Sequence, residues 1–312
     1  MNTTVVGASG YSGRQLVSLL IQHPKINLVE VTSRAYSGKT VESCIPNLRG
    51  KTKGLAFTNP SIEELSKNSK CELFFLALPH GTAASYAIPL LEAGKKVIDL
   101  SADFRLLTPE CYEEFYGTPH PAPEWLKKAT YGLPEIHSFT WDDSPLIASP
   151  GCYPTSILIP LFPLLKDQLI EENDIIANSM SGVSGAGRTA SEKLLYCERN
   201  ESASAYGLPK HRHLSEIEEQ LSLAVTNKII ISFHPHLAPM NRGICSTISA
   251  RAKAGSTRKQ VWDCWNDFYR GRKFVHLLKE GEFPDVSHVV GTNRIDLSVN
   301  HDSRTGRFII CS

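Results

Sequence analysis

The sequence predicts an α/β protein of two domains, a doubly wound parallel sheet followed by an α+β domain with a mixed, mostly antiparallel sheet. Three observations support this prediction. Apolar strand patterns alternate with helical patterns through the first half of the 312 residues, as in a parallel sheet covered on both faces. A glycine-rich turn at residues 7–13 directly follows the first strand pattern. The second half instead alternates apolar and polar residues, which is typical of half-buried strands.

The order of the elements follows from these patterns. In the first half we expect strands at residues 3–6, 27–32, 71–78, 96–100 and 146–148, with helices around residues 16–20 and 82–93. In the second half we expect strands at residues 174–180, 228–233, 243–252, 289–300 and 307–311, with helices at residues 214–224 and 258–269. A turn at residues 149–151 separates the two patterns, so we predict domains at 1–150 and 151–312.

The bulk composition argues against several classes of protein. The net charge is +1, which gives no electrostatic case for nucleic acid or a membrane surface as a partner. The N-terminus lacks the pattern of a signal peptide, and the apolar run at residues 156–165 contains two prolines. The eight cysteines include no C-x-x-C pair, so we expect reduced, mostly buried thiols in a cytoplasmic protein. We predict no metal site.

The glycine-rich turn, GASGYSG, is the first candidate site. Glycines let a backbone approach a diphosphate, and the start of the following helix supplies N–H groups and positive potential. The turn therefore predicts a Rossmann-type nucleotide site. The alternative is a glycine-rich turn of the kind found in any α/β protein. The residues assigned to cofactor binding here are Gly7, Ser9, Gly10, Tyr11, Ser12 and Gly13.

Two further loops extend this predicted site. The second strand ends in Ser33 and Arg34, a hydroxyl and a guanidinium that suit the 2′-phosphate of NADP(H). Arg34 could instead be a solvated loop residue, and Glu30 lies close enough to keep NAD open. Pro79 and His80 follow a buried strand, where loops line the ligand crevice, although capping of the next helix is an equally good role for His80.

Cys152 is the one cysteine with local evidence for reactivity. It lies in SPGCYPT, residues 149–155, where a tight turn leads into an apolar helical run. A thiol at a helix N-terminus has a lowered pKa, and the same backbone amides can hold a developing oxyanion. The alternative is a buried cysteine in a turn, which is the interpretation we apply to the other seven.

With this stretch the chain resembles the N-acetyl-γ-glutamyl-phosphate reductases of the semialdehyde dehydrogenase superfamily. Besides residues 7–13 and 149–155, similar motifs occur at residues 181–188, 205–213, 236–243 and 291–293, in the family's order. The resemblance implies NADPH-dependent reduction of N-acetyl-γ-glutamyl phosphate to the semialdehyde with release of phosphate, in arginine biosynthesis. It implies a thioester on Cys152, a nicotinamide-binding loop at Ser181 and Gly182, and a homo-oligomer, either a dimer or a tetramer.

The resemblance also assigns the proton-transfer group and the anion-binding groups. His213 is the preferred base and His211 the close second. Residues two apart at a helix start point in different directions, so we expect only one to face Cys152. Helix-entry histidines beside Glu216 are the alternative. Four arginines lie in or beside matched motifs and suit the carboxylate and phosphate of the substrate, although some could form structural ion pairs: Arg105, Arg188, Arg212 and Arg242.

Two other interpretations remain open at this point. An aspartate-semialdehyde dehydrogenase would share the fold and the nucleophile, although the motifs at residues 211–213 and 236–243 argue against it. A catalytically dead nucleotide-binding or regulatory protein is the second, which the presence of Cys152 and His213 disfavours.

The chain ends on an apolar strand pattern at residues 307–311. Members of the family continue with a glycine-rich segment and a helix that returns to the nucleotide domain, so the resemblance implies that this segment is absent. We therefore expect an uncovered apolar patch on that domain and weak NADPH binding. The alternative to an active enzyme is a catalytically impaired fragment.

Overall fold

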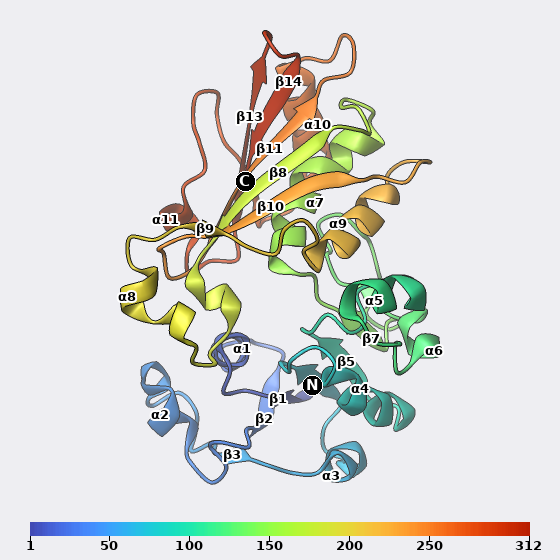
Figure 1. Ribbon diagram of the computed structural model, residues 1–312. Helices are drawn as coiled ribbons and strands as arrows, with labels where there is room; N and C mark the ends of the chain where they lie inside the picture. Colours follow the sequence, from blue (N-terminus) through green and yellow to red (C-terminus); the bar gives the residue numbers. More distant parts are fainter. The chain divides into compact units, whose positions relative to one another are not determined.

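The computed structural model describes residues 1–312 as two compact units (Figure 1). Unit 1 contains Met1–Gly132 and Phe139–Pro150, and unit 2 contains Leu133–Ser138 and Gly151–Ser312. The short segment 133–138 packs with unit 2, where His137 Nε2 lies 2.8 Å from Gln220 Oε1. None of the helices has the length and apolarity that crossing a membrane would require.

Unit 1 is built on a seven-stranded, wholly parallel sheet in the order β3-β2-β1-β4-β5-β7-β6. The strands are β1 (Asn2–Val6), β2 (Asn27–Thr32), β3 (Phe57–Thr58), β4 (Leu73–Leu76), β5 (Lys96–Asp99), β6 (Thr130–Tyr131) and β7 (Leu146–Ala148). The strand order reverses direction beside β1, so the crevice of such a doubly wound sheet is expected at the carboxyl end of β1.

Helices cover both faces of this sheet. They are α1 (Tyr11–Leu20), α2 (Val41–Cys44), η1 (Pro46–Leu48), α3 (Ile62–Lys67), α4 (Ala83–Glu92), α5 (Pro109–Tyr116) and α6 (Pro123–Leu126). Successive residues of β1 point to opposite faces. Val5 belongs to a core cluster with Val17 of α1, whereas Val6 belongs to a second cluster with Leu90 of α4. The predicted doubly wound α/β architecture is confirmed.

Unit 2 contains a mixed seven-stranded sheet in the order β12-β13-β14-β11-β8-β10-β9. Its strands are β8 (Ile175–Ser181), β9 (Ser204–Ala205), β10 (Ile231–Leu237), β11 (Ile244–Arg251), β12 (Val275–Leu277), β13 (Ile295–Asp302) and β14 (Arg307–Cys311). The pairs β8–β10 and β12–β13 are parallel and the other neighbours are antiparallel, as predicted.

Three of the helices of unit 2, α7, α9 and α10, pack on one another and on this sheet (Figure 1). The helices of this unit are α7 (Cys152–Lys166), η2 (Val183–Ala186), η3 (Glu192–Leu194), α8 (Tyr196–Arg199), α9 (His213–Ser222), α10 (Arg258–Phe268) and α11 (Val286–Val289). Nearly every side chain of α7 is buried, which explains its uniformly apolar sequence.

The two prolines inside α7 release carbonyl groups that side chains then satisfy. Pro160 has no N–H for the carbonyl of Ser156, and Ser312 Oγ donates to that oxygen at 2.7 Å. Pro163 likewise releases the carbonyl of Ile159, which accepts from the hydroxyl of Tyr269. These contacts allow a helix with two internal prolines to remain helical at the centre of unit 2.

Some boundaries differ from the sequence-based expectations. The strand expected at 289–300 begins only at Ile295, because α11 and a turn with Gly291 at φ +82° precede it. The strand expected at 228–233 extends to Leu237, since parallel pairing with β8 continues through Pro235 and His236. In both cases pairing in the folded sheet, rather than local composition, sets the limits.

Candidate active site

The glycine turn of unit 1 forms a cradle at the start of α1. Gly7 has φ +81°, and a Cβ there would lie 2.4 Å from Ala77 O, while a Cβ on Gly13 would lie 2.5 Å from Gly7 O. The fold itself therefore requires these two glycines. A Cβ on Gly10 would meet no protein atom closer than 3.8 Å, so its missing side chain leaves open space. Such space beside a helix N-terminus without an acidic first turn fits a bound diphosphate.

The end of β2 lies against this turn. Ser33 Oγ donates to Ser9 Oγ at 2.9 Å, and the N–H of Gly7 donates to Thr32 Oγ1 at 3.2 Å. Arg34 is exposed, and its NH2 lies 3.4 Å from the hydroxyl of Tyr86 on α4. The structure thus brings together the predicted cofactor residues of the first turn and of the second strand.

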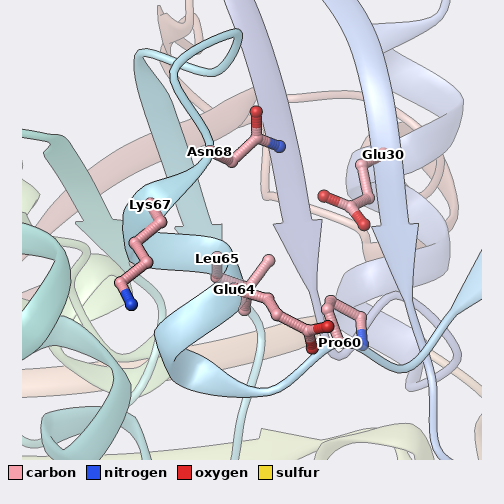
Figure 2. Close-up of a pocket in the computed structure, with 6 residues that line it drawn as sticks. All are labelled: Glu30, Pro60, Glu64, Leu65, Lys67 and Asn68. Atoms are coloured by element: carbon pink, nitrogen blue, oxygen red, sulfur yellow. The ribbon is translucent and has the colours of Figure 1, made fainter.

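Glu30 is engaged elsewhere in unit 1. Its Oε1 accepts from Thr58 Oγ1 at 2.9 Å. Figure 2 shows Glu30 among the residues that line a surface hollow beside α3: Glu30, Pro60, Glu64, Leu65, Lys67 and Asn68. None of the other five belongs to the predicted nucleotide site. One carboxylate oxygen of Glu30 thus accepts a hydrogen bond from Thr58, while Ser33 and Arg34 directly follow β2.

The loop after β4 is fixed by a buried carboxylate that sequence reasoning missed. Asp103 is fully buried, and its Oδ1 and Oδ2 accept from the N–H groups of Gly81 and Ala84 at 2.7 and 3.0 Å. Asp103 thereby supplies the cap of α4 that we had considered for His80. The ring of His80 lies 5.9 Å from that of Tyr116. The signal for Asp103 was its place in SADFR, just after β5.

Arg105 follows in the same stretch and is almost fully buried. Its Nε donates to Ser149 O at 2.7 Å, and its NH2 donates to Leu100 O at 2.9 Å. Both contacts are to the backbone of unit 1. Arg105 thus fixes the first residue of SPGC, and a role in anion binding stays a prediction.

Cys152 is the first residue of α7 and is exposed. The preceding Gly151 has extended backbone angles, φ −69° and ψ 159°, and no side chain caps the helix. The N–H of Gly151 donates to Glu216 Oε1 of α9 at 2.7 Å, and Glu216 is only 2% exposed. A buried carboxylate on α9 therefore fixes the turn that presents the thiol. The sequence showed Glu216 only as a neighbour of the histidines.

The two histidines converge on Tyr153, the residue after the thiol. The ring of Tyr153 lies 5.7 Å from that of His211 and 5.9 Å from that of His213, and the two imidazoles are 5.0 Å apart. The expectation that the two side chains point in different directions is therefore wrong, whereas the expectation that only one of them faces Cys152 stays a prediction. His211 lies before α9, which begins at His213, so helical spacing does not govern its direction.

The hydroxyl and imidazole groups of this cluster are perturbed by burial. The hydroxyl of Tyr206 donates to that of Tyr153 at 2.9 Å, and burial raises the pKa of both phenols. Burial, followed by the charge of Arg212, lowers the pKa of His211 to about 4.

The predicted nicotinamide loop packs against the motif at residues 236–243. The N–H of Gly182 donates to Gly243 O at 3.0 Å, and a Cβ on Gly182 would lie 2.6 Å from the backbone N of Arg242. Arg242, Arg188 and Arg212 are all exposed in unit 2, with Arg212 at the N-cap of α9. The structure thus joins Ser181, Gly182 and Arg242, while Arg105 belongs to unit 1.

The remaining cysteines only partly match the expectation of buried thiols. Cys71 and Cys264 are buried and Cys197 is exposed, whereas the other four are half-buried. Cys197 is the second residue of the short helix α8 and lies in no matched motif. Exposure alone therefore does not distinguish Cys152; its place as the first residue of a long helix does.

Comparisons with known proteins agree with this architecture. The family model "semialdehyde dehydrogenase, NAD binding domain" matches residues 2–143, and "semialdehyde dehydrogenase, dimerisation domain" matches residues 152–312. Among solved structures, aspartate semialdehyde dehydrogenase II from Vibrio cholerae superposes with a TM-score of 0.72 at 17% identity, over 99% of this chain and 91% of that one. The enzyme with NADP from Candida albicans gives a TM-score of 0.66 at 15% identity, over 100% and 92%. At these identities the likeness shows the fold.

Sequence relatives place the chain more closely. The N-acetyl-gamma-glutamyl-phosphate reductase of Akkermansia muciniphila is 48% identical over 100% of this chain and 90% of that protein. The reductase of the same name from Geobacter metallireducens is 45% identical over 100% of this chain and 89% of that protein. The chain therefore belongs to the semialdehyde dehydrogenase family, among the N-acetyl-γ-glutamyl-phosphate reductases.

Proposed function

We propose that this chain is an NADP-dependent acyl-phosphate reductase that converts N-acetyl-γ-glutamyl phosphate into N-acetylglutamate semialdehyde and phosphate, a step of arginine biosynthesis. The observation that carries the proposal is the start of α7. There an exposed thiol occupies the first position of a long helix, next to a tyrosine on which two imidazoles converge. Relatives named for this reaction share 41–48% of their residues with the chain.

The first chemical step follows from the position of Cys152. The free N–H groups and the dipole of a helix N-terminus stabilise a thiolate, which attacks the acyl carbon and expels phosphate to leave a thioester. Cys152 and Tyr153 carry N–H groups in the first turn, whereas Pro154 carries none. The amides of these two residues are therefore the donors for the oxyanion that forms during attack.

His213 is the proposed proton-transfer group. It takes the proton of the Cys152 thiol to give the attacking thiolate, and it returns a proton to the sulfur when the tetrahedral alkoxide formed by reduction collapses to the aldehyde. Glu216 supports this step indirectly, because its carboxylate holds the N–H of Gly151 before the thiol. Arg188, Arg212 and Arg242 are exposed guanidinium groups of unit 2 and are proposed for the carboxylate and phosphate of the substrate.

The cofactor supplies the hydride that reduces the thioester carbonyl. Gly7, Ser9, Gly10, Tyr11, Ser12 and Gly13 would hold its diphosphate, with Ser33 and Arg34 at the ribose phosphate, Pro79 and His80 along the loop after β4, and Ser181 and Gly182 at the nicotinamide. The cradle at Gly10, which no protein atom fills, supports this assignment. The engagement of Glu30 by Thr58 supports NADP over NAD.

The proposal extends to assembly and compartment. Residues 152–312 match a dimerisation domain, and we propose that the chain forms a homodimer or a homotetramer. None of the eight cysteines forms a disulfide, which suits the reducing cytoplasm. We propose the divisions 1–150 for the nucleotide domain and 151–312 for the catalytic domain.

The decisive experiment is an NADP-linked assay run in reverse, with N-acetylglutamate semialdehyde and phosphate. Turnover of this substrate, and little turnover of aspartate semialdehyde, is the expected result. Preference for aspartate semialdehyde would overturn the substrate assignment. Alkylation with iodoacetamide at neutral pH tests the nucleophile separately, since Cys152 should react faster than Cys197, which is also exposed.

A further inference from the structure

We propose that His211 is a positioning residue that stays in one neutral tautomer and caps α9, so that His213 alone transfers protons. The inference rests on the proposed function for the identity of the reaction. It deepens that function by dividing two roles between two histidines that the sequence could not separate. The geometry that points to it is the hydrogen bond from the backbone of His213 to the ring of His211.

The direction of this hydrogen bond fixes the tautomer of His211. The N–H of His213 donates to His211 Nδ1 at 3.1 Å, so Nδ1 carries a lone pair and the single ring proton lies on Nε2. A doubly protonated imidazole has no acceptor and would lose this bond. His211 therefore cannot take up a proton at Nδ1 without releasing the start of α9.

The same contacts form a cap at the helix N-terminus. The carbonyl of His211 accepts from the N–H of Leu214 at 2.9 Å, while its ring accepts from the N–H two residues on. Asparagine and aspartate make this pattern at helix starts with their side-chain oxygens. The nominal N-cap, Arg212, makes no side-chain cap, so His211 supplies it.

The surroundings of the ring hold it in place and keep it neutral. His211 packs edge-on against Tyr153, Tyr206 and Phe233, with ring centroids 5.5–5.7 Å apart. Gly207, at φ +63°, permits close approach, because a Cβ there would lie 2.8 Å from the imidazole.

The ionisable groups that face His211 do not favour its cation. They are Tyr153, Tyr206, His213 and Arg212. The two phenols stay neutral because burial raises the pKa of each hydroxyl. Arg212 is cationic and, together with burial, lowers the pKa of His211 to about 4. The electrostatic environment and the hydrogen-bond geometry therefore agree.

Two substitutions separate the cap from proton transfer. In His211→Asn the amide oxygen takes the place of Nδ1 and can still accept from the N–H of His213, whereas in His211→Gln the amide extends toward the position of Nε2. We expect His211→Asn to retain kcat within about tenfold of wild type, and His211→Gln to lose at least about tenfold more. The titration step that His213 contributes to the pH profile of kcat should remain in His211→Asn as in wild type. It should be absent from His213→Asn, which is the matched control.

A nitrogen NMR titration of labelled histidines tests the tautomer without reference to activity. We expect His211 to remain in the neutral Nε2–H form from pH 5 to pH 8. Three results would each overturn the proposal. They are a cationic or Nδ1–H ring of His211 near pH 6.5, loss of the His213 titration step from the pH profile of His211→Asn, and a higher kcat in His211→Gln than in His211→Asn. If His211→Asn and His213→Asn both kept this titration step, the assignment of His213 would instead be contradicted. NADPH binding by each variant checks that the variant is folded.

Discussion

The chain begins two helices in nearly the same way and uses them for different purposes. α1 and α7 both follow a glycine with extended angles, Gly10 at φ −70° and ψ 170°, and Gly151 at φ −69° and ψ 159°. Neither has a side-chain cap or an acidic residue in its first turn. Neither helix therefore neutralises its N-terminal N–H groups with a side chain of its own first turn.

The difference lies in what surrounds each start. Around α1 the chain has glycines in place of side chains, and Gly10 leaves space that suits the diphosphate of a nucleotide. Around α7 the chain adds them: a thiol at the first position, a buried tyrosine at the second and a carboxylate behind the cap. A helix N-terminus thus supplies only a positive electrostatic potential. The side chains around it decide whether that potential suits the binding of an anionic ligand or the formation of an anion on the chain.

The largest effect should follow from removing the anion at α7. Cys152→Ser is expected to lower kcat by about 10³-fold or more, because a hydroxyl is not stabilised as an anion by the helix start. NADPH should still bind, as a fluorescence titration can measure. Cys197→Ser, another exposed cysteine of unit 2, is the control. Activity above a few per cent in Cys152→Ser would rule out covalent catalysis there.

At α1 two glycines should respond differently. Gly13→Ala places a Cβ 2.5 Å from Gly7 O and should destabilise the protein by about 1–3 kcal/mol, seen in urea unfolding. Gly10→Ala places a Cβ no closer than 3.8 Å to any protein atom and should cost less than about 1 kcal/mol of stability, yet weaken NADPH binding about tenfold. Unchanged NADPH affinity in Gly10→Ala would mean that the cradle does not hold the diphosphate.

Glu216 should support the start of α7 more as a hydrogen-bond acceptor than as a negative charge. Glu216→Leu leaves the buried N–H of Gly151 without its acceptor, which costs about 1–3 kcal/mol, and kcat should fall about tenfold or more. Glu216→Gln retains an oxygen and should lose less. If leucine and glutamine gave equal kcat values, the hydrogen bond would have no role in presenting the thiol.

The smallest effect should appear at the edge of the α1 site. Arg34→Ala is expected to raise the KM for NADPH about tenfold and leave that for NADH unaltered, because only NADPH carries the 2′-phosphate. Arg49→Ala, at another exposed arginine of unit 1, is the matched control. Equal changes for both cofactors would show that Arg34 does not contact the phosphate.

The fold class and the starts of α1 and α7 could be predicted from local patterns. Strand alternation, glycine spacing and a turn before an apolar run each involve only a few neighbouring residues. β2, β7 and β14 have the predicted limits for the same reason. The expectations tied to the end of the chain stay predictions.

The supporting residues could not be predicted in this way. Asp103 acts on Gly81, and Glu216 acts on Gly151 across 65 positions, so neither contact has a local signature. The convergence of His211 and His213 depends on where α9 begins, and helix boundaries are the least certain part of a sequence-based prediction.

The prolines of α7 also bear on the order in which the chain folds. Donors to the carbonyls of Ser156, Ile159 and Pro160 come from residues 156, 110 and 105 positions later in the sequence. Contacts of such long range carry a large loop-closure entropy and form late. The helix that begins at Cys152 therefore has all of these carbonyls satisfied only when α10, Tyr269 and Ser312 have docked. We therefore expect the enhanced reactivity proposed for Cys152 only in molecules that have finished folding, and an ordinary thiol in a nascent or partly unfolded chain.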